Sequence, residues 1–316
     1  MIKILCVGEA LIDMICTDKN EPLSQGTHYV RRAGGAPTNV AAAIAALGGK
    51  TDLTAKVGID PFGDHLVAVM NEFGVGTKWI FRDNAFTTFA FVSLMDTGDR
   101  DFYFNRGADG NLQSSELDQI PIDDYGIIHF GSATAFLPGP LQQAYLLLLQ
   151  KAIAKNIFVS FDPNYRHLLF PDGNQSFIEQ SWHFLSNADF FKLSDEEALL
   201  LTGKQNLQDA ITDLLVKTKG VFTITLGKEG ALLGFQGTQL VVPGITAVSV
   251  DSTGAGDAFA GAILYQLSKR SIDTIRELSK SEWVAVVSNA NKAGARTCEW
   301  LGAMEAFKNL SNSIFD

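Results

Sequence analysis

Residues 251–257 read DSTGAGD, and an apolar run over 258–267 follows at once. Glycines let the backbone turn sharply here, so that consecutive N–H groups converge on one point. The helix expected next adds the unpaired N–H groups of its first turn and the positive end of its dipole. The stretch therefore predicts an anion site built from the main chain of Gly254, Ala255 and Gly256.

Asp257 closes this turn, where a carboxylate would compete with a bound anion. A proton acceptor beside a phosphate cradle resolves the conflict, because phosphoryl transfer to a hydroxyl uses both. An acidic residue in the first turn of a helix is also common and stabilising without any catalytic role. The stretch alone leaves both interpretations open.

The overall composition limits the classes of protein to which this chain can belong. The chain has 316 residues, 46% of them hydrophobic, and a formal net charge of −10. An acidic surface argues against a nucleic-acid partner, and no apolar run reaches the ~20 residues of a membrane span. Residues 1–8 read as a first strand and not as a signal peptide. Three separated cysteines (Cys6, Cys16 and Cys298) favour reduced thiols in a cytoplasmic protein, and their spacing does not resemble a zinc site.

Strand-like and helix-like segments alternate along most of the chain. The expected strands are 2–7, 53–57, 127–130, 157–161, 190–193, 222–225 and 231–235. The expected helices are 36–47, 62–73, 141–155, 195–201, 207–215, 258–267 and 283–297. Continuous apolar strands that alternate with helices predict an α/β fold with a mainly parallel central sheet and helices on both faces.

One part of the chain departs from this alternation of strands and helices. Residues 87–95 and 99–106 flank DTG at 96–98, which is a hairpin signal, and 11–16 and 28–33 are further short strands. We expect these segments to form a small antiparallel sheet that projects from a single domain over 1–316. Such a sheet would be a lid over a ligand, a dimer surface, or both.

Several polar groups follow expected strands, at the edge where open α/β sheets bind ligands. Asp13 can accept two hydroxyl hydrogen bonds, which suits a polyol. Arg166, in DPNYR at 162–166, can meet a sugar hydroxyl, a phosphate or a carboxylate. GGAPTN at 34–39 opens a helix where glycines let a ligand approach the backbone. Taken singly, each is also consistent with a plain loop or surface residue.

Two further motifs have both a structural and a functional interpretation. Ser194 is an N-cap with Glu197 at the capping-box position, and the carboxylates of 195–197 can also hold a hydrated Mg²⁺. TLGKEG at 225–230 is either a plain turn or a loop that a nucleotide can approach. The chain has neither a G-x-G-x-x-G fingerprint nor a P-loop, which argues against a dinucleotide oxidoreductase and a P-loop enzyme.

Together, these pieces resemble the ribokinase-like (pfkB) carbohydrate kinase family. Residues 34–39 and 56–63 (KVGIDPFG) are similar to its N-terminal signature, and 251–259 (DSTGAGDAF) to its C-terminal signature. The resemblance runs through nearly the whole chain. It implies a three-layer α/β fold with a small β-sheet lid.

The resemblance also implies roles for individual residues. Asp257 is then the catalytic base, with Gly254, Ala255 and Gly256 as the anion hole. Substrate contacts are implied for Asp13, Gly34, Gly35, Asn39, Phe104, Arg106 and Arg166. Nucleotide contacts are implied for Lys192, Ser194 (where relatives often have Asn), Thr225, Gly227, Gly230 and Asn289. Glu197 would hold Mg²⁺ through water, and Asp251 and Thr253 would border a candidate K⁺ site.

Within the family, fructokinases look most similar, through GEALID at 8–13, the motifs at 162–166 and 194–197, and GADGNL at 107–112. The resemblance implies transfer of the γ-phosphoryl group of ATP to a ketohexose, at O6 of D-fructose, with Mg²⁺. We also expect a homodimer through the lid, because apolar strand surface at Phe89, Phe91 and Phe102 would otherwise be exposed. A 2-keto-3-deoxygluconate kinase, another sugar or nucleoside kinase, and a non-catalytic sugar or nucleotide sensor remain alternatives.

Overall fold

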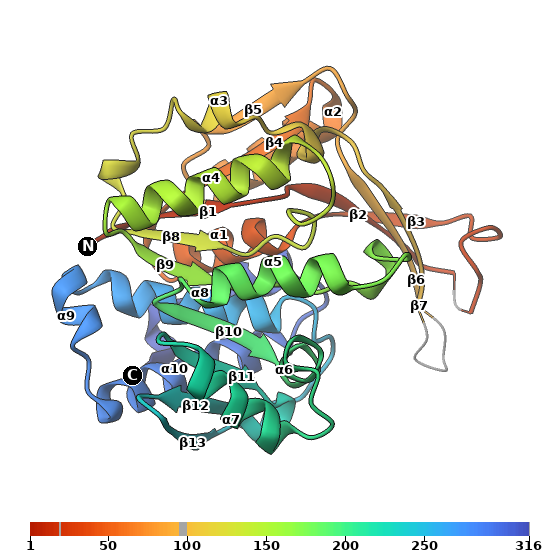
Figure 1. Ribbon diagram of the computed structural model, residues 1–316. Coiled ribbons are helices and arrows are strands. Elements are labelled where there is room, and N and C mark those ends of the chain that lie inside the picture. Colours follow the sequence, from red (N-terminus) through yellow and green to blue (C-terminus); the bar gives the residue numbers. More distant parts are fainter. Residues whose placement is uncertain (19, 95–99, 316) are drawn as a thin grey trace.

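The computed structural model describes residues 1–18, 20–94 and 100–315, and Figure 1 shows how their elements are arranged. In these ranges the strands form two sheets, a central sheet of nine strands and a small sheet of four. The order of the central sheet is β13-β12-β11-β10-β9-β8-β1-β4-β5, and that of the small sheet is β3-β2-β6-β7.

The element bounds are as follows. The central sheet contains β1 (Lys3–Val7), β4 (Lys50–Gly58), β5 (Ile80–Asp83), β8 (Ile127–Phe130), β9 (Phe158–Phe161), β10 (Phe190–Ser194), β11 (Val221–Thr225), β12 (Gly230–Phe235) and β13 (Thr238–Pro243). The small sheet contains β2 (Leu11–Cys16), β3 (Tyr29–Gly34), β6 (Phe89–Leu94) and β7 (Arg100–Asn105). The α-helices are α1 (Ala36–Ala46), α2 (Pro61–Phe73), α3 (Ser114–Leu117), α4 (Pro140–Ala154), α5 (Gln175–Leu185), α6 (Asp195–Thr202), α7 (Leu207–Lys217), α8 (Ala255–Ser268), α9 (Ile272–Arg276), α10 (Lys280–Thr297) and α11 (Ala303–Lys308). The 3-10 helices are η1 (Ala108–Asn111), η2 (Ile122–Asp124), η3 (His167–Leu169), η4 (Gly227–Glu229) and η5 (Asn312–Phe315).

The central strand β1 shows why the chain forms three layers. Its side chains alternate, with Ile4 and Cys6 in one hydrophobic core and Leu5 and Val7 in the other. Helices α1, α8 and α10 cover the first face, and α4, α5, α6 and α7 cover the second (Figure 1). A strand buried on both faces is mainly apolar, as β1 is, although neighbouring strands also bury polar side chains such as Asp52, Lys56 and Lys192. The predicted α/β fold with a covered, mainly parallel sheet is confirmed.

The far edge of the central sheet differs from the rest. Strands β11, β12 and β13 pair antiparallel, whereas the strands from β10 to β5 pair parallel. The expected strands and helices lie within a few residues of the observed ones. Among the strands and α-helices of the described residues, two strands (β5 and β13) and four helices (α3, α5, α9 and α11) were not predicted. Within the described residues, no helix combines the length and apolar character needed to cross a membrane.

The small sheet projects from the body at one side (Figure 1). It is not wholly antiparallel as expected, because β2 and β6 pair parallel. Strand β2 follows β1 along the chain and β6 follows β5, and the two lie side by side in the small sheet. Strands β6 and β7 pair antiparallel as predicted. The hairpin signal at 96–98 lies outside the described residues.

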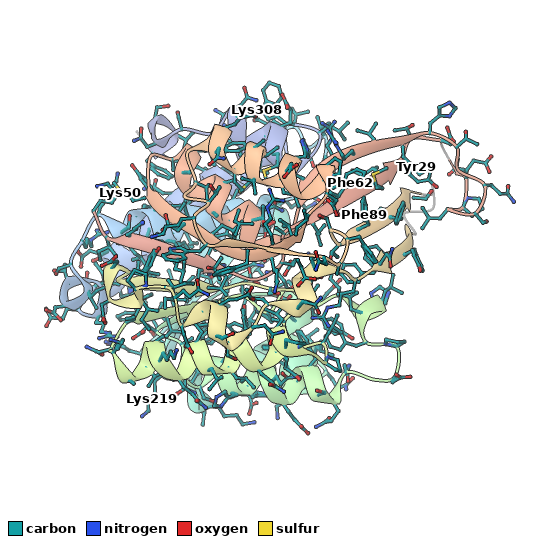
Figure 2. The ribbon with its side chains drawn as sticks, turned by 90° about the horizontal axis from the view of Figure 1, so that it is seen from above. Tyr29, Lys50, Phe62, Phe89, Lys219 and Lys308 are labelled. Carbon is teal, nitrogen blue, oxygen red and sulfur yellow. The ribbon has the colours of Figure 1, made fainter. Side chains whose placement is uncertain are left out.

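The two faces of the small sheet have different surroundings. The register places Asp13, Ala90 and Phe104 on one face, which we call the inner face, and Phe91 and Tyr103 on the other, the outer face. The expectation of a shared apolar surface at Phe89, Phe91 and Phe102 needs correction. Phe102 lies on the inner face, the other two lie on the outer face, and all three are half-buried. Phe62 of α2 packs edge-on against Phe89, with ring centroids 4.8 Å apart (Figure 2).

Candidate active site

Helix α8 begins at the turn that the sequence singled out. Its N-cap, Gly254, has φ 81°. A Cβ at this position would collide with Ala303 of α11, so both the backbone conformation and the packing require glycine. The first turn then offers the N–H groups of Gly256 and Asp257 and the positive end of the helix dipole, whereas the Ala255 N–H donates to the Ser252 carbonyl at 3.1 Å. Gly254 thus forms the turn, and Gly256 and Asp257 supply the main-chain N–H groups of the candidate anion site.

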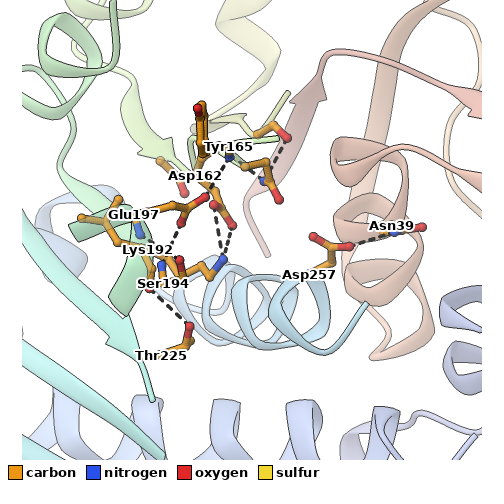
Figure 3. A network of polar contacts seen from close by, with 12 residues as sticks. Asn39, Asp162, Tyr165, Lys192, Ser194, Glu197, Thr225 and Asp257 are labelled. Atoms are coloured by element: carbon orange, nitrogen blue, oxygen red, sulfur yellow. Dashed lines mark hydrogen bonds and ion pairs between the residues drawn. The ribbon is translucent and has the colours of Figure 1, made fainter. Parts of the chain in front are cut away.

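Asp257 lies in this first turn and is 9% exposed. Its Oδ2 accepts a 2.8 Å hydrogen bond from the side-chain amide of Asn39 on α1 (Figure 3). Burial raises the pKa of Asp257 to about 6, and the charge of Asp162 adds to the rise. The Asn39 hydrogen bond and the positive charges of Lys192 and Arg166 act in the opposite direction. The carboxyl group is thus ionised at neutral pH and is a stronger proton acceptor than an ordinary aspartate.

Asp13 of β2 lies near this carboxylate, on the inner face of the small sheet. Its pKa rises to about 7, chiefly through burial, with the charge of Asp257 raising it and that of Arg166 lowering it. Gly34 lies against the Asp13 carboxylate, so closely that any Cβ there would overlap it. Gly35 has φ 104°, and a Cβ on it would lie 2.5 Å from the Glu9 carbonyl. These glycines leave a polar cradle beside Asp257.

Asn39 has a free hydrogen-bond acceptor. Its amide nitrogen is used by Asp257, but within the described residues its buried Oδ1 has no partner. A buried polar atom without a partner is costly, and a bound hydroxyl would relieve that cost. Asn39, Asp13 and Asp257 together offer hydrogen-bond acceptors from α1, β2 and α8, as a polyol requires.

A buried ion pair borders the other side of the anion site. Lys192 of β10 donates to Asp162, which follows β9, with the ammonium nitrogen 3.0 Å from Oδ2 (Figure 3). A Cβ on Gly256 would lie 3.3 Å from the same nitrogen, so the ammonium sits directly beside the first turn of α8. Burial alone would lower the pKa of Lys192, but the charges of Asp162, Glu197 and Asp257 together raise it. The lysine is therefore a permanent positive charge next to the main-chain anion site.

Ser194 and Glu197 form the capping box that the sequence predicted. Ser194 Oγ accepts from the Glu197 N–H at 3.1 Å, and Glu197 Oε2 accepts from the Ser194 N–H at 2.7 Å. Glu197 Oε1 also accepts from the Tyr165 N–H at 2.8 Å, which ties α6 to the segment after β9. Each carboxylate oxygen keeps a further lone pair. The donor set fits a metal held through water and ATP phosphates, as Mg²⁺ prefers. It does not form a closed protein cage, since the described residues contain no group of three or more acidic, His or Cys side chains suited to a metal ion.

The predicted nucleotide loop follows β11. Thr225 donates from its hydroxyl to the Leu193 carbonyl at 3.3 Å. Gly227 has φ 57° with open space where a Cβ would project, and Gly230 has φ 103° with Val242 and Gly244 packed against it. The glycine conformations and the open side at Gly227 suit close approach of a ligand.

Helix α10 borders this loop through Asn291 rather than through Asn289. Asn291 donates to the carbonyls of Val242 and Pro243, at 3.1 and 2.9 Å, and Pro243 pairs with Gly230. Asn289 instead donates to Gln266, near the C-terminal end of α8. The two asparagines lie about 200° apart around the helix, so they cannot share one ligand face.

The carboxylate of Asp251 accepts three hydrogen bonds in the turn that precedes α8. Its Oδ1 accepts from the N–H and the hydroxyl of Thr253, at 3.0 and 2.7 Å, and its Oδ2 accepts from the Gly302 N–H at 2.8 Å. The residues expected to border a K⁺ ion are therefore adjacent, and they connect the turn before α8 to the segment that leads into α11.

The three remaining candidates lie around the inner face. Phe104 is on that face, with its ring stacked on Phe102 at 6.3 Å. Arg106 follows β7, and its guanidinium donates to the carbonyls of Pro138 (2.9 Å) and Thr134 (3.1 Å) and lies 3.5 Å from the carboxylate of Asp109. Arg166 is exposed, and its charge lowers the pKa of both Asp13 and Asp257. Arg106 is thus largely occupied by the protein, and Arg166 balances two carboxylates.

No role was predicted for Asp162, Glu9 or Asp109, although all three lie in motifs that the sequence singled out (162–166, 8–13 and 107–112). Asp162 and Glu9 follow the buried strands β9 and β1, at the carboxyl edge where ligand-binding groups gather. That position was an available signal for both. Asp109 lies in the 3-10 helix η1, which has no comparable sequence signal.

The chain is similar to known proteins in both sequence and fold. The sequence profile described as pfkB family carbohydrate kinase matches residues 1–309. A relative named probable fructokinase-5, from Arabidopsis thaliana, is 36% identical over 270 residues, 84% of this chain and 83% of that protein. The crystal structure of a fructokinase with bound ATP from Xylella fastidiosa is 31% identical with a TM-score of 0.87, covering 99% of this chain and 96% of that chain. A fructokinase double mutant from Vibrio cholerae O395, in a fructose, ADP and potassium ion bound form, is 28% identical with a TM-score of 0.84 and covers 100% and 97%.

The fold and these likenesses define a phosphotransferase that acts on a hydroxyl of a sugar. The profile match spans nearly the whole chain, as the resemblance in residues 34–63 and 251–259 implied. The chain belongs to the pfkB family of carbohydrate kinases.

Proposed function

We propose that this protein is an ATP-dependent fructokinase that phosphorylates D-fructose at O6. The observation that carries the proposal is Asp257, a buried carboxylate with its pKa near 6, set in the first turn of α8 and oriented by Asn39. The similarity to fructokinases at 28–36% identity supports the substrate.

The chemistry follows from where these groups lie. A sugar hydroxyl held by Asp13 and Asn39 gives its proton to Asp257 as its oxygen attacks the γ-phosphorus of ATP, and the bond to the β–γ bridging oxygen breaks. The N–H groups of Gly256 and Asp257 and the ammonium of Lys192 stabilise charge on the transferred group. Mg²⁺, held through water near Glu197, would supply further positive charge on the phosphates. The loop from Thr225 to Gly230, together with α10, binds the part of the nucleotide that lies beyond the phosphates.

The charge balance of the site favours a neutral acceptor. A sugar acid such as 2-keto-3-deoxygluconate needs a cation for its carboxylate. Arg106 already has Asp109 and two carbonyls as partners, and Arg166 faces Asp13 and Asp257. Fructose carries no charge and needs only hydrogen bonds, so it fits this arrangement better than an acid does.

The small sheet acts as a lid in this proposal. Its inner face brings Asp13 and Phe104 to the acceptor, and closure would exclude water from the reacting phosphate. A second copy of the chain would cover the outer face, where Tyr103 is 60% exposed and contacts Phe91. Sedimentation at several concentrations should give a dimer for the parent and a smaller species for Tyr103→Lys. Identical sedimentation of the two as a monomer would remove the dimer from the proposal.

A potassium site at Asp251 and Thr253 is a further part of the proposed function. The fructokinase from Vibrio cholerae O395 in the potassium-bound form supports this assignment. Turnover in K⁺ should exceed turnover in Na⁺ at equal ionic strength, and Asp251→Asn should abolish the difference.

One substrate panel tests the whole proposal. Fructose, 2-keto-3-deoxygluconate, ribose and adenosine are each supplied with ATP and Mg²⁺, with ADP release as the readout and Asp257→Asn as the background. We expect kcat/KM to be highest for fructose, and the ¹³C signal of C6 in the product to show coupling to phosphorus. A higher kcat/KM for the sugar acid than for fructose would identify the sugar acid as the substrate. Binding of fructose and ATP without ADP release would identify a sensor instead.

A further inference from the structure

Within the described residues, the chain crosses between the body and the small sheet four times. The crossings are 8–10 (β1 to β2), 34–36 (β3 to α1), 84–88 (β5 to β6) and 106–108 (β7 to η1). Any movement of the small sheet relative to Asp257 must take place at these four places.

Glu9 connects the first two crossings. Its Oε1 accepts from the Ala36 N–H at 2.9 Å, and its carbonyl accepts from the Thr38 hydroxyl at 3.0 Å. The Glu9 carbonyl also lies so close to Gly35 that no side chain fits there. Glu9 is almost fully buried, so these hydrogen bonds are shielded from water.

Asp109 connects the other two crossings. Its Oδ1 accepts from the hydroxyl of Thr88, and the Thr88 hydroxyl oxygen accepts from the Gly107 N–H at 2.9 Å. The backbone adds a bond from the Ala108 N–H to the Phe86 carbonyl at 2.8 Å. Asp109 is also almost fully buried. The start of β6 and the end of β7 are therefore held together by one carboxylate.

A single loop after β8 joins the two carboxylates. Ser132 donates from its hydroxyl to Glu9 Oε2 at 2.5 Å, and Thr134 donates from its hydroxyl to Asp109 Oδ2 at 2.8 Å. The Ser132 oxygen in turn accepts from the N–H groups of Thr134 and Ala135, at 3.2 and 3.0 Å. Both hydroxyl-bearing residues are buried. We call Glu9, Ser132, Thr134, Asp109 and Thr88 the crossing network.

We propose that Glu9 and Asp109 are positioning residues of the kinase reaction, which through the crossing network hold all four crossings as one unit and set the distance between the small sheet and Asp257. The proposal rests on the proposed function, in which the small sheet closes over the sugar. Asp13 and Phe104 lie beyond the crossings, so their placement against the acceptor depends on the network. Lys192 and the loop from Thr225 to Gly230 belong to the body and lie outside the network.

Two substitutions at Thr134 test the network by kinetics. Thr134→Val keeps the size of the buried side chain but removes the hydroxyl that Asp109 accepts, and Thr134→Ser keeps the hydroxyl. We expect Thr134→Val to raise KM for the sugar roughly tenfold to a hundredfold, since a hydrogen bond to a charged group is lost. KM for ATP should stay within about twofold of the parent value, and more ATP should be hydrolysed per sugar phosphorylated. Thr134→Ser should behave as the parent. Equal increases in both KM values would overturn the proposal.

Hydrogen exchange supplies a readout that does not need turnover. In Thr134→Val, the amides of Ala36, Gly107 and Ala108 should exchange faster together, although Ala36 lies on the Glu9 side of the network. Amides in α7 and α10 should exchange as in the parent. Faster exchange confined to 132–135, or spread evenly over the protein, would also overturn the proposal. If the parent phosphorylates no sugar but the crossings still respond together, the proposed function fails while the network stands.

Discussion

The side-chain amide of Asn39 donates a 2.8 Å hydrogen bond to Oδ2 of Asp257, although the two residues are 218 positions apart in the sequence. This bond leaves Oδ1 of Asp257 for an incoming hydroxyl and fixes the carboxylate at the N-terminus of α8. It also joins α1 to α8. In the proposed function, Asn39 therefore orients the catalytic base, and its Oδ1, which has no partner within the described residues, can accept from the sugar.

Replacing Asp257 by asparagine should abolish turnover without abolishing ATP binding. Asp257→Asn keeps the shape of the side chain and can still accept from Asn39, but it cannot take a proton. We expect kcat to fall by about 10²–10⁴, the usual contribution of a general base, while the affinity for ATP measured by calorimetry stays near that of the parent. Turnover close to the parent value would refute the role of Asp257 as the base.

The same substitution should stabilise the protein at neutral pH. The pKa of Asp257 rises from 3.8 to about 6 on folding, so the protonated form is the one that the fold favours. Its stabilising contribution is present below about pH 4 and is lost as the pH rises through 6. Asp257→Asn cannot ionise, so its free energy of unfolding should exceed that of the parent by up to about 3 kcal/mol at pH 8. Below pH 4 the gain should vanish. Urea denaturation at both pH values checks this, and an equal gain at the two would show that ionisation of Asp257 is not the cause.

The activity should depend on pH through Asp13 and Asp257. Burial raises the pKa of Asp13 to about 7 and that of Asp257 to about 6, and the charge of Arg166 lowers both. Both carboxylates must be ionised to accept hydrogen bonds or a proton, so kcat/KM should fall as the pH drops below about 7, with pKa values that belong to the pair. Arg166→Gln should move the midpoint to higher pH, whereas Arg166→Lys should leave it near that of the parent. An unchanged midpoint in Arg166→Gln would exclude this electrostatic coupling.

The Lys192–Asp162 ion pair allows stability and catalysis to be separated. Lys192→Met leaves the Asp162 carboxylate buried without its partner, which should cost about 3–5 kcal/mol of stability. The double variant Lys192→Met with Asp162→Asn should recover most of that loss, because no buried charge remains. Its kcat should nevertheless stay low, since the ammonium beside Gly256 is missing. Thermal melts and ADP release measured on both variants decide the matter, and full recovery of kcat in the double variant would remove Lys192 from the phosphoryl site.

Much of the fold followed from local patterns. The apolar runs that became β1, β8 and β10 and the small-residue runs that became α1 and α8 carry strong signals. The elements that were missed carry weaker ones. Strand β13 is a sheet edge with alternating exposure, and helix α5 mixes its buried Phe177 and Phe184 with polar neighbours. The helical spacing of those two residues was present in the sequence and was a usable signal.

The site was predictable only in part, because its geometry joins distant segments. The anion site was predicted from the chemistry of residues 251–257 themselves, that is, from their glycines and the carboxylate of Asp257. Asp13 was a candidate from its place after the first strand, whereas the roles of Asn39 and Lys192 came from the family resemblance. The raised pKa of Asp257 depends on burial and on Asp162, which only the folded chain provides. The crossing network unites five buried residues from four separate segments, and no local pattern marks such an assembly.

Gly254 packs against Ala303, and Asp251 accepts from the Gly302 N–H, 51 positions later in the sequence. The turn that precedes the catalytic helix is therefore completed by a segment that leaves the ribosome well after it. A nascent chain that has emerged only as far as Asp257 contains the proposed base. It still lacks Gly302 and Ala303, which contact the proposed phosphate-binding turn. Such a chain would not bind nucleotide productively, so synthesis itself would delay the onset of catalysis until α11 has folded back.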